Sequence, residues 1–438
     1  PPIMIFCHDF LDIQNRFPVV CSHRSSENGK DEANMKALYF DNSLPRIVMV
    51  QAASLLYRQA ALLPFSPTHY AEVPEPEIPN PRWLKVKNLA CGLCGSDIHF
   101  MFMEMDPKCF PAATPGIARK YLGHELLGEV METGNEVDGL KKGDRVCLRI
   151  DWPSCFQMEL DPMCPQCARG EYMLCQNLGA RDLAVADAGC GFSPWMVMHK
   201  TQPFKVPDNL TNDEALLLEP MAVAVHAVMK HPPAAGNRVL VVGCGTIGLL
   251  TIAAAKAMVK DAEVTVLARY PFQAEMARAL GADEVITGRQ DPYRRIAQQT
   301  CAKYFEGYFG NQILLGGYDV IYDSIGNDGS LNNALRWAKS QGTIVMVGVN
   351  FKPGKIDYTP MWHQELHVTG INCHILQEGS GASSFDIAAQ LIAEKRLPVS
   401  RLITHRFPMD RWRDAVKTFL SKGDRGAIKI VLEHPGAH

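Results

Sequence analysis

The sequence lacks any surplus of positive charge. Its 438 residues include 44 lysines and arginines against 47 aspartates and glutamates, a formal net charge of −3, and the basic residues are scattered along the chain. A protein that binds the phosphate backbone of a nucleic acid normally carries a basic excess on at least one domain. The composition therefore argues against a nucleic-acid partner.

The first residues also lack the pattern of a secretory leader, a basic segment followed by a long apolar one. One apolar run, residues 239–259, has about the length of a membrane span. Three glycines lie within its first ten residues and Lys256 interrupts its end, so a buried strand, a tight turn and a helix explain it better. We therefore expect a cytoplasmic protein that does not bind membranes.

Cysteine is too sparse for a fold held together by disulfides, with 14 in the whole chain. Six of the cysteines nevertheless fall into two groups. They are Cys91 and Cys94, and then Cys155, Cys164, Cys167 and Cys175. In a cytosolic enzyme such groups are typical of metal or catalytic sites.

The pattern of apolar residues predicts an α/β protein of two domains. Residues 35–210 show short strand patterns separated by glycine and proline, with one stretch of helical spacing at 50–63. From about residue 214, strand and helix patterns alternate, which predicts a doubly wound parallel sheet. We expect an extension at 1–34, a β-rich domain made of 35–221 and 363–438, and a domain with the parallel sheet at 222–362.

The sequence VLVVGCGTIG places three glycines, Gly243, Gly245 and Gly248, after a predicted strand and at the start of a predicted helix. In a G-x-G-x-x-G turn, one glycine permits the tight turn and the next lets the backbone approach a pyrophosphate. The third lets helix and strand pack closely. We expect a dinucleotide site here, which also includes Thr246 and Ile247.

The following strand, EVTVLA, lacks the acidic residue that would bind a ribose 2′-hydroxyl, and Ala268 is followed by Arg269. Arginine can pair with the 2′-phosphate that a carboxylate would repel. The sequence therefore favours NADP over NAD as the cofactor. In the alternative interpretation, Arg269 stacks on the adenine or faces solvent.

Five segments occur in a characteristic order: CGLCGSDIH, GHELLGEV, GDRV, LLEPMAVAVHAV and VVGCGTIG. In this order they resemble the zinc-dependent medium-chain dehydrogenase/reductase superfamily, and most of all its polyol, threonine and sugar dehydrogenase branch. The resemblance covers roughly residues 35–435. It implies a β-rich GroES-like catalytic domain and a Rossmann domain, with zinc and a nicotinamide cofactor.

The resemblance also implies a catalytic zinc site. Its ligands would be the thiolate of Cys94, the imidazole of His124 and the carboxylate of Glu125, with Glu219 bound directly or through water. Three protein ligands leave a position for substrate, as catalytic zinc requires.

Two residues near Cys94 resemble the family's proton relay. Ser96 would pass the substrate's proton on, and His99 would deliver it to solvent. The alternatives are a turn residue for Ser96, a surface residue for His99, and a role for Asp97 in orienting a ligand. Cys91 is expected to be a strand residue and not a ligand.

A second zinc would be structural. Cys164, Cys167 and Cys175 match the family's structural lobe, but the position three before Cys164 is Asp161, where the pattern has cysteine. Cys155, further back, is the competing fourth ligand and the softer one.

The predicted function is reversible oxidation of an alcohol to its carbonyl by hydride transfer, with a secondary alcohol of a polyol, sugar or amino alcohol as substrate. One alternative is a broad-specificity alcohol dehydrogenase that acts as an aldehyde or ketone reductase. Another is a non-catalytic protein that binds zinc and nucleotide. The resemblance also implies a homodimer or homotetramer. The segment 44–70 is an insertion whose role the sequence does not show.

Overall fold

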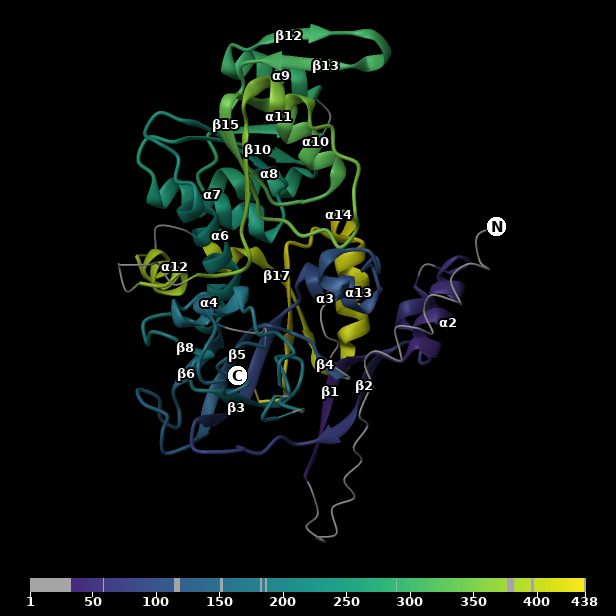
Figure 1. Ribbon diagram of the computed structural model, residues 1–438, viewed down its shortest axis with the longest axis vertical. Coiled ribbons are helices and arrows are strands. Elements are labelled where there is room, and N and C mark those ends of the chain that lie inside the picture. The colour runs from purple at the N-terminus through teal and green to yellow at the C-terminus, as the bar shows by residue number, and fades with distance from the viewer. Residues whose placement is uncertain are drawn as a thin grey trace.

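The computed structural model shows two lobes stacked along the long axis of the molecule (Figure 1). The residues it describes are 33–57, 59–113, 119–149, 153–181, 183–185, 187–288, 290–375, 382–394 and 398–436. Among them, no helix is long and apolar enough to cross a membrane. The expected extension at 1–34 lies almost wholly outside the described residues.

The upper lobe in Figure 1 is built on a six-stranded parallel sheet in the order β11-β10-β9-β14-β15-β16. Its strands are β9 (Arg238–Val242), β10 (Glu263–Ala268), β11 (Glu284–Thr287), β14 (Tyr318–Asp323), β15 (Ala338–Met346) and β16 (His367–Gly370). Every neighbouring pair is parallel. This is the Rossmann order, because each half of the sheet runs outward from the central strands β9 and β14. The predicted α/β class and parallel sheet are confirmed.

Helices α6 to α11 belong to this lobe or to its border. They are α6 (Leu218–Lys230), α7 (Thr246–Met258), α8 (Pro271–Ala279), α9 (Pro292–Thr300), α10 (Asp328–Trp337) and α11 (Thr359–Gln364). The apolar run at 239–259 forms β9 and α7, which are both buried in the core. A strand with both faces covered and a helix beneath it account for the continuous apolar run.

The lower lobe contains a seven-stranded sheet and a three-stranded sheet. The larger follows the path β17-β18-β3-β5-β6-β8, with β7 paired to β3, and the smaller has the order β2-β1-β4. The strands of the larger sheet are β3 (Trp83–Gly92), β5 (Glu125–Thr133), β6 (Arg145–Leu148), β7 (Trp195–His199), β8 (Pro203–Lys205), β17 (Ile403–Pro408) and β18 (Lys429–Glu433). Those of the smaller are β1 (Asn34–Asp41), β2 (Thr68–Pro74) and β4 (Arg119–Tyr121).

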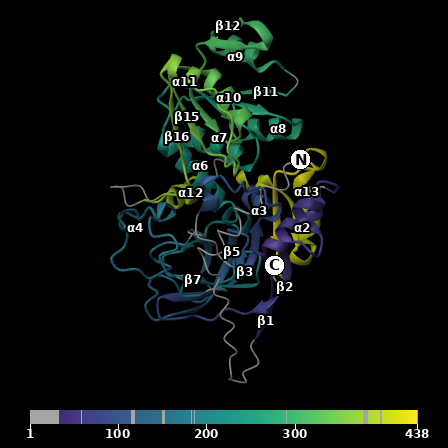
Figure 2. The same ribbon diagram turned by 45° about the vertical axis from the view of Figure 1, so that its right-hand side comes forward.

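The C-terminal part of the chain returns to this lobe. Figures 1 and 2 show its yellow ribbon beside the blue N-terminal strands, where β18 pairs with β3. The remaining helices of the lobe are α3 (Gly95–Met101), α4 (Pro165–Ala168), α5 (Asn212–Ala215), α12 (Ser384–Ala393), α13 (Trp412–Leu420) and α14 (Lys422–Arg425). The parallel sheet extends to Gly370, beyond the domain boundary expected at 362, because β16 pairs with β15. The boundary expected at 221 falls inside α6.

The helical segment expected at 50–63 starts earlier and is broken. Helix α2 (Leu44–Ser54) begins with a proline in its first turn, where the missing N–H does no harm, and a short 3-10 turn follows at Ala60–Leu62. Leu55 and Leu56 at its end are exposed. The insertion therefore lies on the surface of the lower lobe (Figure 2).

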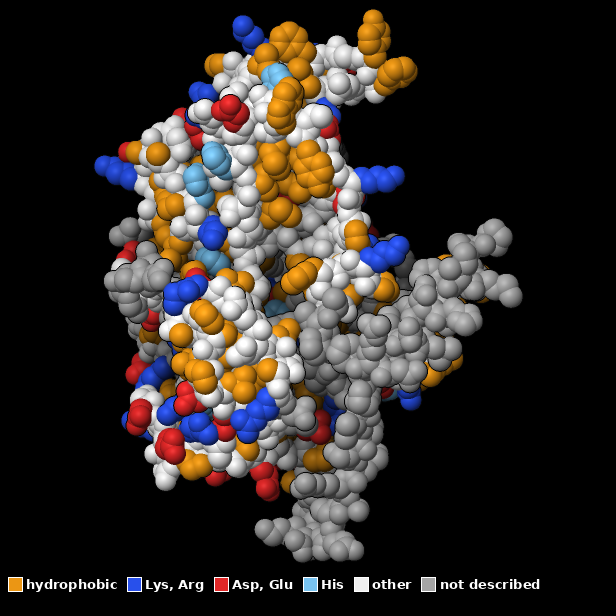
Figure 3. Space-filling model, in the orientation of Figure 1, with side chains coloured by type: hydrophobic (Ala, Val, Ile, Leu, Met, Phe, Trp, Pro, Cys, Tyr) orange, Lys and Arg blue, Asp and Glu red, His pale blue; other side chains and the backbone are white. Residues whose placement is uncertain are grey.

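A hairpin of β12 (Lys303–Glu306) and β13 (Gln312–Leu315), not predicted from the sequence, lies at the top of the upper lobe in Figure 1. Its tip exposes Tyr308 and Phe309, and Figure 3 shows hydrophobic side chains projecting at this end. The hairpin lies far along the chain from every motif above and contributes nothing to the sites described next.

Candidate active site and metal centres

Three of the predicted zinc ligands form one group. The ligand atoms of Cys94, His124 and Glu125 all lie within 4.8 Å of one another. Strand β3 ends at Gly92, just before Cys94, and β5 begins at Glu125. Because Gly92 pairs with Glu125 across the antiparallel sheet, the two segments meet at this edge.

Asp97 fixes the two segments relative to each other. Its buried carboxylate accepts hydrogen bonds from the backbone N–H of Cys94, at 3.0 Å, and of Gly123, at 3.1 Å. The Nδ1 atom of His124 lies 3.9 Å from the same carboxylate. The contacts fit the alternative in which Asp97 orients the ligands without binding metal.

A buried lysine that no sequence motif indicates lies beside the ligands. Lys429, on β18, is 3% exposed and forms an ion pair with Glu125, which is 2% exposed. Burial raises the pKa of Glu125, and the nearby Glu219 raises it further, whereas Lys429 opposes both. Burial alone would lower the pKa of Lys429, but attraction to Glu125 and Cys94 raises it above its usual value. The lysine thus offsets the negative charge of the ligand group.

Gly92 makes room for this ion pair. A Cβ atom at position 92 would overlap the carboxylate of Glu125. The first glycine of CGLCG, Gly92, is therefore needed where β3 passes Glu125. Cys91, beside it, is a buried strand residue, as expected.

Glu219, in the first turn of α6, lies outside the group of three. Its Oε1 atom is 2.7 Å from Nε2 of His374 instead, and both side chains are less than 10% exposed. Glu219 is still close enough to raise the pKa of Glu125. This placement fits a contact to the metal through water better than direct ligation.

The predicted relay residues lie on α3, which begins after Cys94. Nδ1 of His99 is 2.6 Å from the carboxylate of Glu104, and its ring meets the edge of Phe351 with centroids 5.4 Å apart. Phe351 follows β15 of the upper lobe, so His99 lies where the lobes meet. Ser96 is half-buried in the first turn of the helix.

The second cysteine cluster is complete with Cys155. The sulfur atoms of Cys155, Cys164, Cys167 and Cys175 lie within 4.8 Å of one another, and this group does not include Asp161, which is exposed. Against the effect of burial, backbone N–H groups of Cys167 and Gln176 lower the pKa of Cys164 to about 6. Four soft donors in a closed set are the pattern of a structural zinc site.

The glycine motif has the geometry that a dinucleotide site needs. Gly243 has a φ of 96°, which favours glycine, and a Cβ at Gly248 would overlap the carbonyl oxygen of Gly243. Gly245, which caps α7, has open space on its Cβ side. Thr246 and Ile247 open the helix, and the hydroxyl of Thr246 donates to the carbonyl of Ile428 in the lower lobe, at 3.1 Å.

Arg269 follows the end of β10 and is exposed. Its guanidinium lies over the ring of Tyr270, 5.4 Å from the centroid. Lys422, on α14 of the lower lobe, lies close by: burial lowers its pKa, and the charge of Arg269 lowers it further. Two cations therefore lie together where the ribose of a bound dinucleotide is expected.

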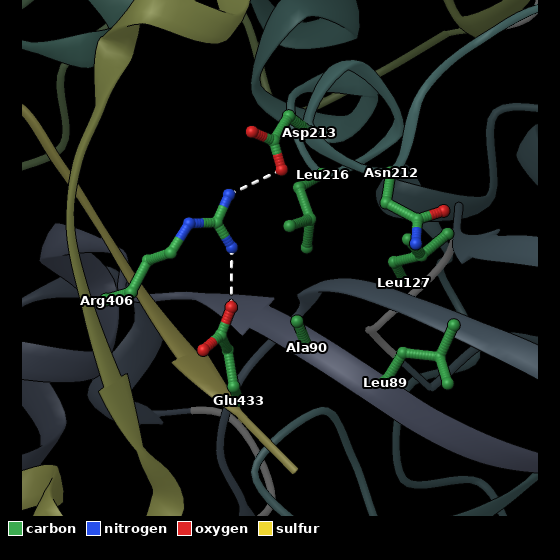
Figure 4. Close-up of a pocket in the computed structure, with 8 residues that line it drawn as sticks. All are labelled: Leu89, Ala90, Leu127, Asn212, Asp213, Leu216, Arg406 and Glu433. Atoms are coloured by element: carbon green, nitrogen blue, oxygen red, sulfur yellow. Dashed lines mark hydrogen bonds and ion pairs between the residues drawn. The ribbon is translucent and has the colours of Figure 1, made fainter. Parts of the chain in front are cut away.

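A cavity of about 300 Å³ lies elsewhere, between the lower sheet and α5 (Figure 4). None of the predicted ligands lines it. Its Arg406 is paired with both Asp213 and Glu433, so the cation is already neutralised. The cavity offers none of the chemistry predicted from the sequence.

Comparison with known families agrees with this geometry. Residues 80–208 match the alcohol dehydrogenase GroES-like domain, and residues 246–392 match the zinc-binding dehydrogenase domain. The chain belongs to the zinc-dependent medium-chain dehydrogenases. Members of this family are oxidoreductases that act on CH–OH groups, and the predicted family and enzyme class are confirmed.

Individual relatives of this dehydrogenase are distant. It is 28% identical to L-idonate 5-dehydrogenase of Vitis vinifera, over 80% of this chain and 87% of the relative. It is 29% identical to human sorbitol dehydrogenase, over 82% and 91%. A zinc-binding dehydrogenase from Sinorhizobium meliloti 1021, solved with NADP bound, is 25% identical and superposes with a TM-score of 0.65 over 92% of this chain and all of its own.

Proposed function

We propose that this dehydrogenase interconverts a secondary alcohol of a polyol, sugar or amino alcohol and its carbonyl. The observation that carries the proposal is the group of Cys94, His124 and Glu125, which supplies three metal ligands and leaves one position for substrate. The polyol class is supported by the sorbitol and L-idonate dehydrogenases among its relatives.

The residues present fit a zinc ion and a nicotinamide dinucleotide. A thiolate, an imidazole and a carboxylate are sound zinc ligands, and the open Cβ side of Gly245 lets a pyrophosphate approach the backbone. When bound, zinc supplies Lewis-acid activation of the hydroxyl, and the nicotinamide accepts the hydride. Glu219 would contact the metal through water.

The chain's own residues then handle the proton. Ser96 accepts it from the substrate hydroxyl, and His99 passes it on to solvent. Glu104 accepts a hydrogen bond from Nδ1–H of His99 and so fixes which ring nitrogen is free to take up a proton. Asp97 keeps the two segments that carry the ligands in register.

The closed group of four cysteines supports Cys155, Cys164, Cys167 and Cys175 as the ligands of a structural zinc. We also propose the domain division expected from the sequence, with the borders moved to α6 and to the end of β16. Cytoplasmic location and a homodimer or homotetramer remain proposals. The first is supported by the free thiol state of the twelve described cysteines.

NADP is the preferred cofactor in this proposal, because Arg269 and Lys422 can both pair with a 2′-phosphate. We expect Arg269→Glu to weaken NADP binding by about 10- to 100-fold, since a charge-assisted hydrogen bond contributes about 1.5–3 kcal/mol. NAD binding should change little. Titration of both cofactors, followed by fluorescence quenching, measures the change.

Arg278→Ala is the matched control, because Arg278 is an exposed arginine at the other end of α8. It should leave both affinities unchanged. Equal losses of NADP and NAD affinity in Arg269→Glu would contradict the assignment.

The proposed reaction is tested on the wild-type protein with a panel of polyols, sugars, amino alcohols and simple primary alcohols. We expect turnover of vicinal diols with a secondary hydroxyl, and little with primary alcohols. Faster reduction of simple aldehydes than of ketoses would favour a broad-specificity reductase. No turnover from a protein that binds both zinc and cofactor would favour a binding role.

A further inference from the structure

The segment that leaves β16 contacts both the region of the four cysteines and helix α6. The side-chain amide of Asn372 donates a hydrogen bond to the carbonyl of Met173, at 3.0 Å. Met173 lies in the segment 155–175 that carries the second cysteine cluster, which we call the four-cysteine lobe. His226, on α6, lies 2.8 Å from the carbonyl of Cys373. The next residue, His374, contacts Glu219 on the same helix. Glu219 is thus linked through this segment to the four-cysteine lobe.

The ring of His374 is buried and contacts both Glu219 and Phe385. It is about 94% buried and packs against Phe385, with centroids 4.9 Å apart. Its Nδ1 and the Nε of Arg149 have no hydrogen-bond partner among the described residues, and both residues line a cavity of about 20 Å³. A cavity of this size accommodates one water. Because the carboxylate of Glu219 accepts, Nε2–H of His374 is the donor of this hydrogen bond, and a water in the cavity would join Nε of Arg149 to Nδ1.

The contact with Glu219 explains why this carboxylate is absent from the group of three ligands. Its Oε1 atom is bound to His374, whereas Glu125 reaches Cys94 and His124. A fourth protein ligand would close the position that the substrate needs. Because Glu219 stays outside the ligand group, this position is left open.

We propose that His374 is a positioning residue, supported by the four-cysteine lobe, that holds Glu219 off the metal and keeps the substrate position open. The proposal rests on the proposed function for the role of that position. His374 touches neither substrate nor cofactor in this arrangement and acts through Glu219. Loss of such an outer contact typically costs 10- to 100-fold in activity or metal affinity.

The test compares two amides at position 374. The side-chain nitrogen of glutamine reaches the place of Nε2, and that of asparagine reaches only the place of Nδ1. Co²⁺ exchanged into the catalytic site reports its ligands through visible absorption, and added imidazole probes the open position. In wild type and His374→Gln, we expect imidazole to shift the cobalt bands. In His374→Asn, the freed Glu219 should occupy the position and abolish the shift, and kcat should fall 10- to 100-fold with less change in KM.

His226→Leu is the control, because it also removes an imidazole that joins α6 to the segment after β16, at the carbonyl of Cys373. In this variant, imidazole should still shift the cobalt bands. A full imidazole shift in His374→Asn would overturn the proposal, and so would loss of the shift in both amide variants. Because the spectra need no substrate, they test His374 even if the wild type oxidises no polyol. A wild type that oxidises no polyol but shows the expected cobalt spectra would contradict the proposed reaction and leave the role of His374 supported.

Discussion

Replacing Cys94 by alanine is expected to abolish turnover and to remove one metal ion per chain. The thiolate is the softest ligand of the catalytic group, and only two protein ligands would remain. Zinc lowers the barrier by several kcal/mol, so kcat should fall at least about 10³-fold. Metal analysis should find about two zinc ions per chain in the wild type and about one in the variant.

Cys91→Ala is the matched control, because Cys91 is a buried thiol three residues before Cys94, in strand β3, and lies outside the ligand group. It should retain both zinc ions and most of the activity. If Cys94→Ala keeps wild-type activity, the catalytic-zinc assignment is wrong. If the wild type holds one zinc that survives in the variant, a zinc-free role would take precedence.

Replacing Cys155 by alanine is expected to produce the largest loss of stability. Structural zinc contributes its binding energy directly to folding, and losing a metal site typically costs more than about 4 kcal/mol. In a chain of 438 residues that unfolds as one unit, this corresponds to a fall in Tm of about 4 °C. Differential scanning calorimetry and metal analysis of the same samples should show both losses together.

Asp161→Asn decides between the two candidate fourth ligands. The substitution keeps the shape of an exposed side chain and removes its charge, so Tm and zinc content should not change. If Asp161→Asn loses zinc and Cys155→Ala does not, the carboxylate is the ligand after all.

The sequence was sufficient for the parts of this enzyme that are local in the chain. The glycine turn, the ligands in GHE and CGLC, and the alternation of strands and helices each depend on neighbouring residues. The fold class and family predicted from them are confirmed. The choice between Cys155 and Asp161 could not be made, because it depends on how a loop of irregular structure closes.

Contacts between distant residues were not predictable from the sequence alone. Lys429 lies in an ordinary strand pattern, and nothing nearby in the sequence marks it as the partner of Glu125. His374 likewise follows a strand without any motif. An isolated lysine in an apolar strand is the available signal, because a buried charge needs a partner.

The ion pair between Glu125 and Lys429 also has a consequence for the order of synthesis. The two residues are 304 positions apart, and the whole nucleotide-binding domain lies between them. During translation, Cys94, His124 and Glu125 leave the ribosome long before the lysine that neutralises them. Lys429 can therefore pair with Glu125 only after the nucleotide-binding domain has been synthesised and β18 has entered the sheet between β17 and β3.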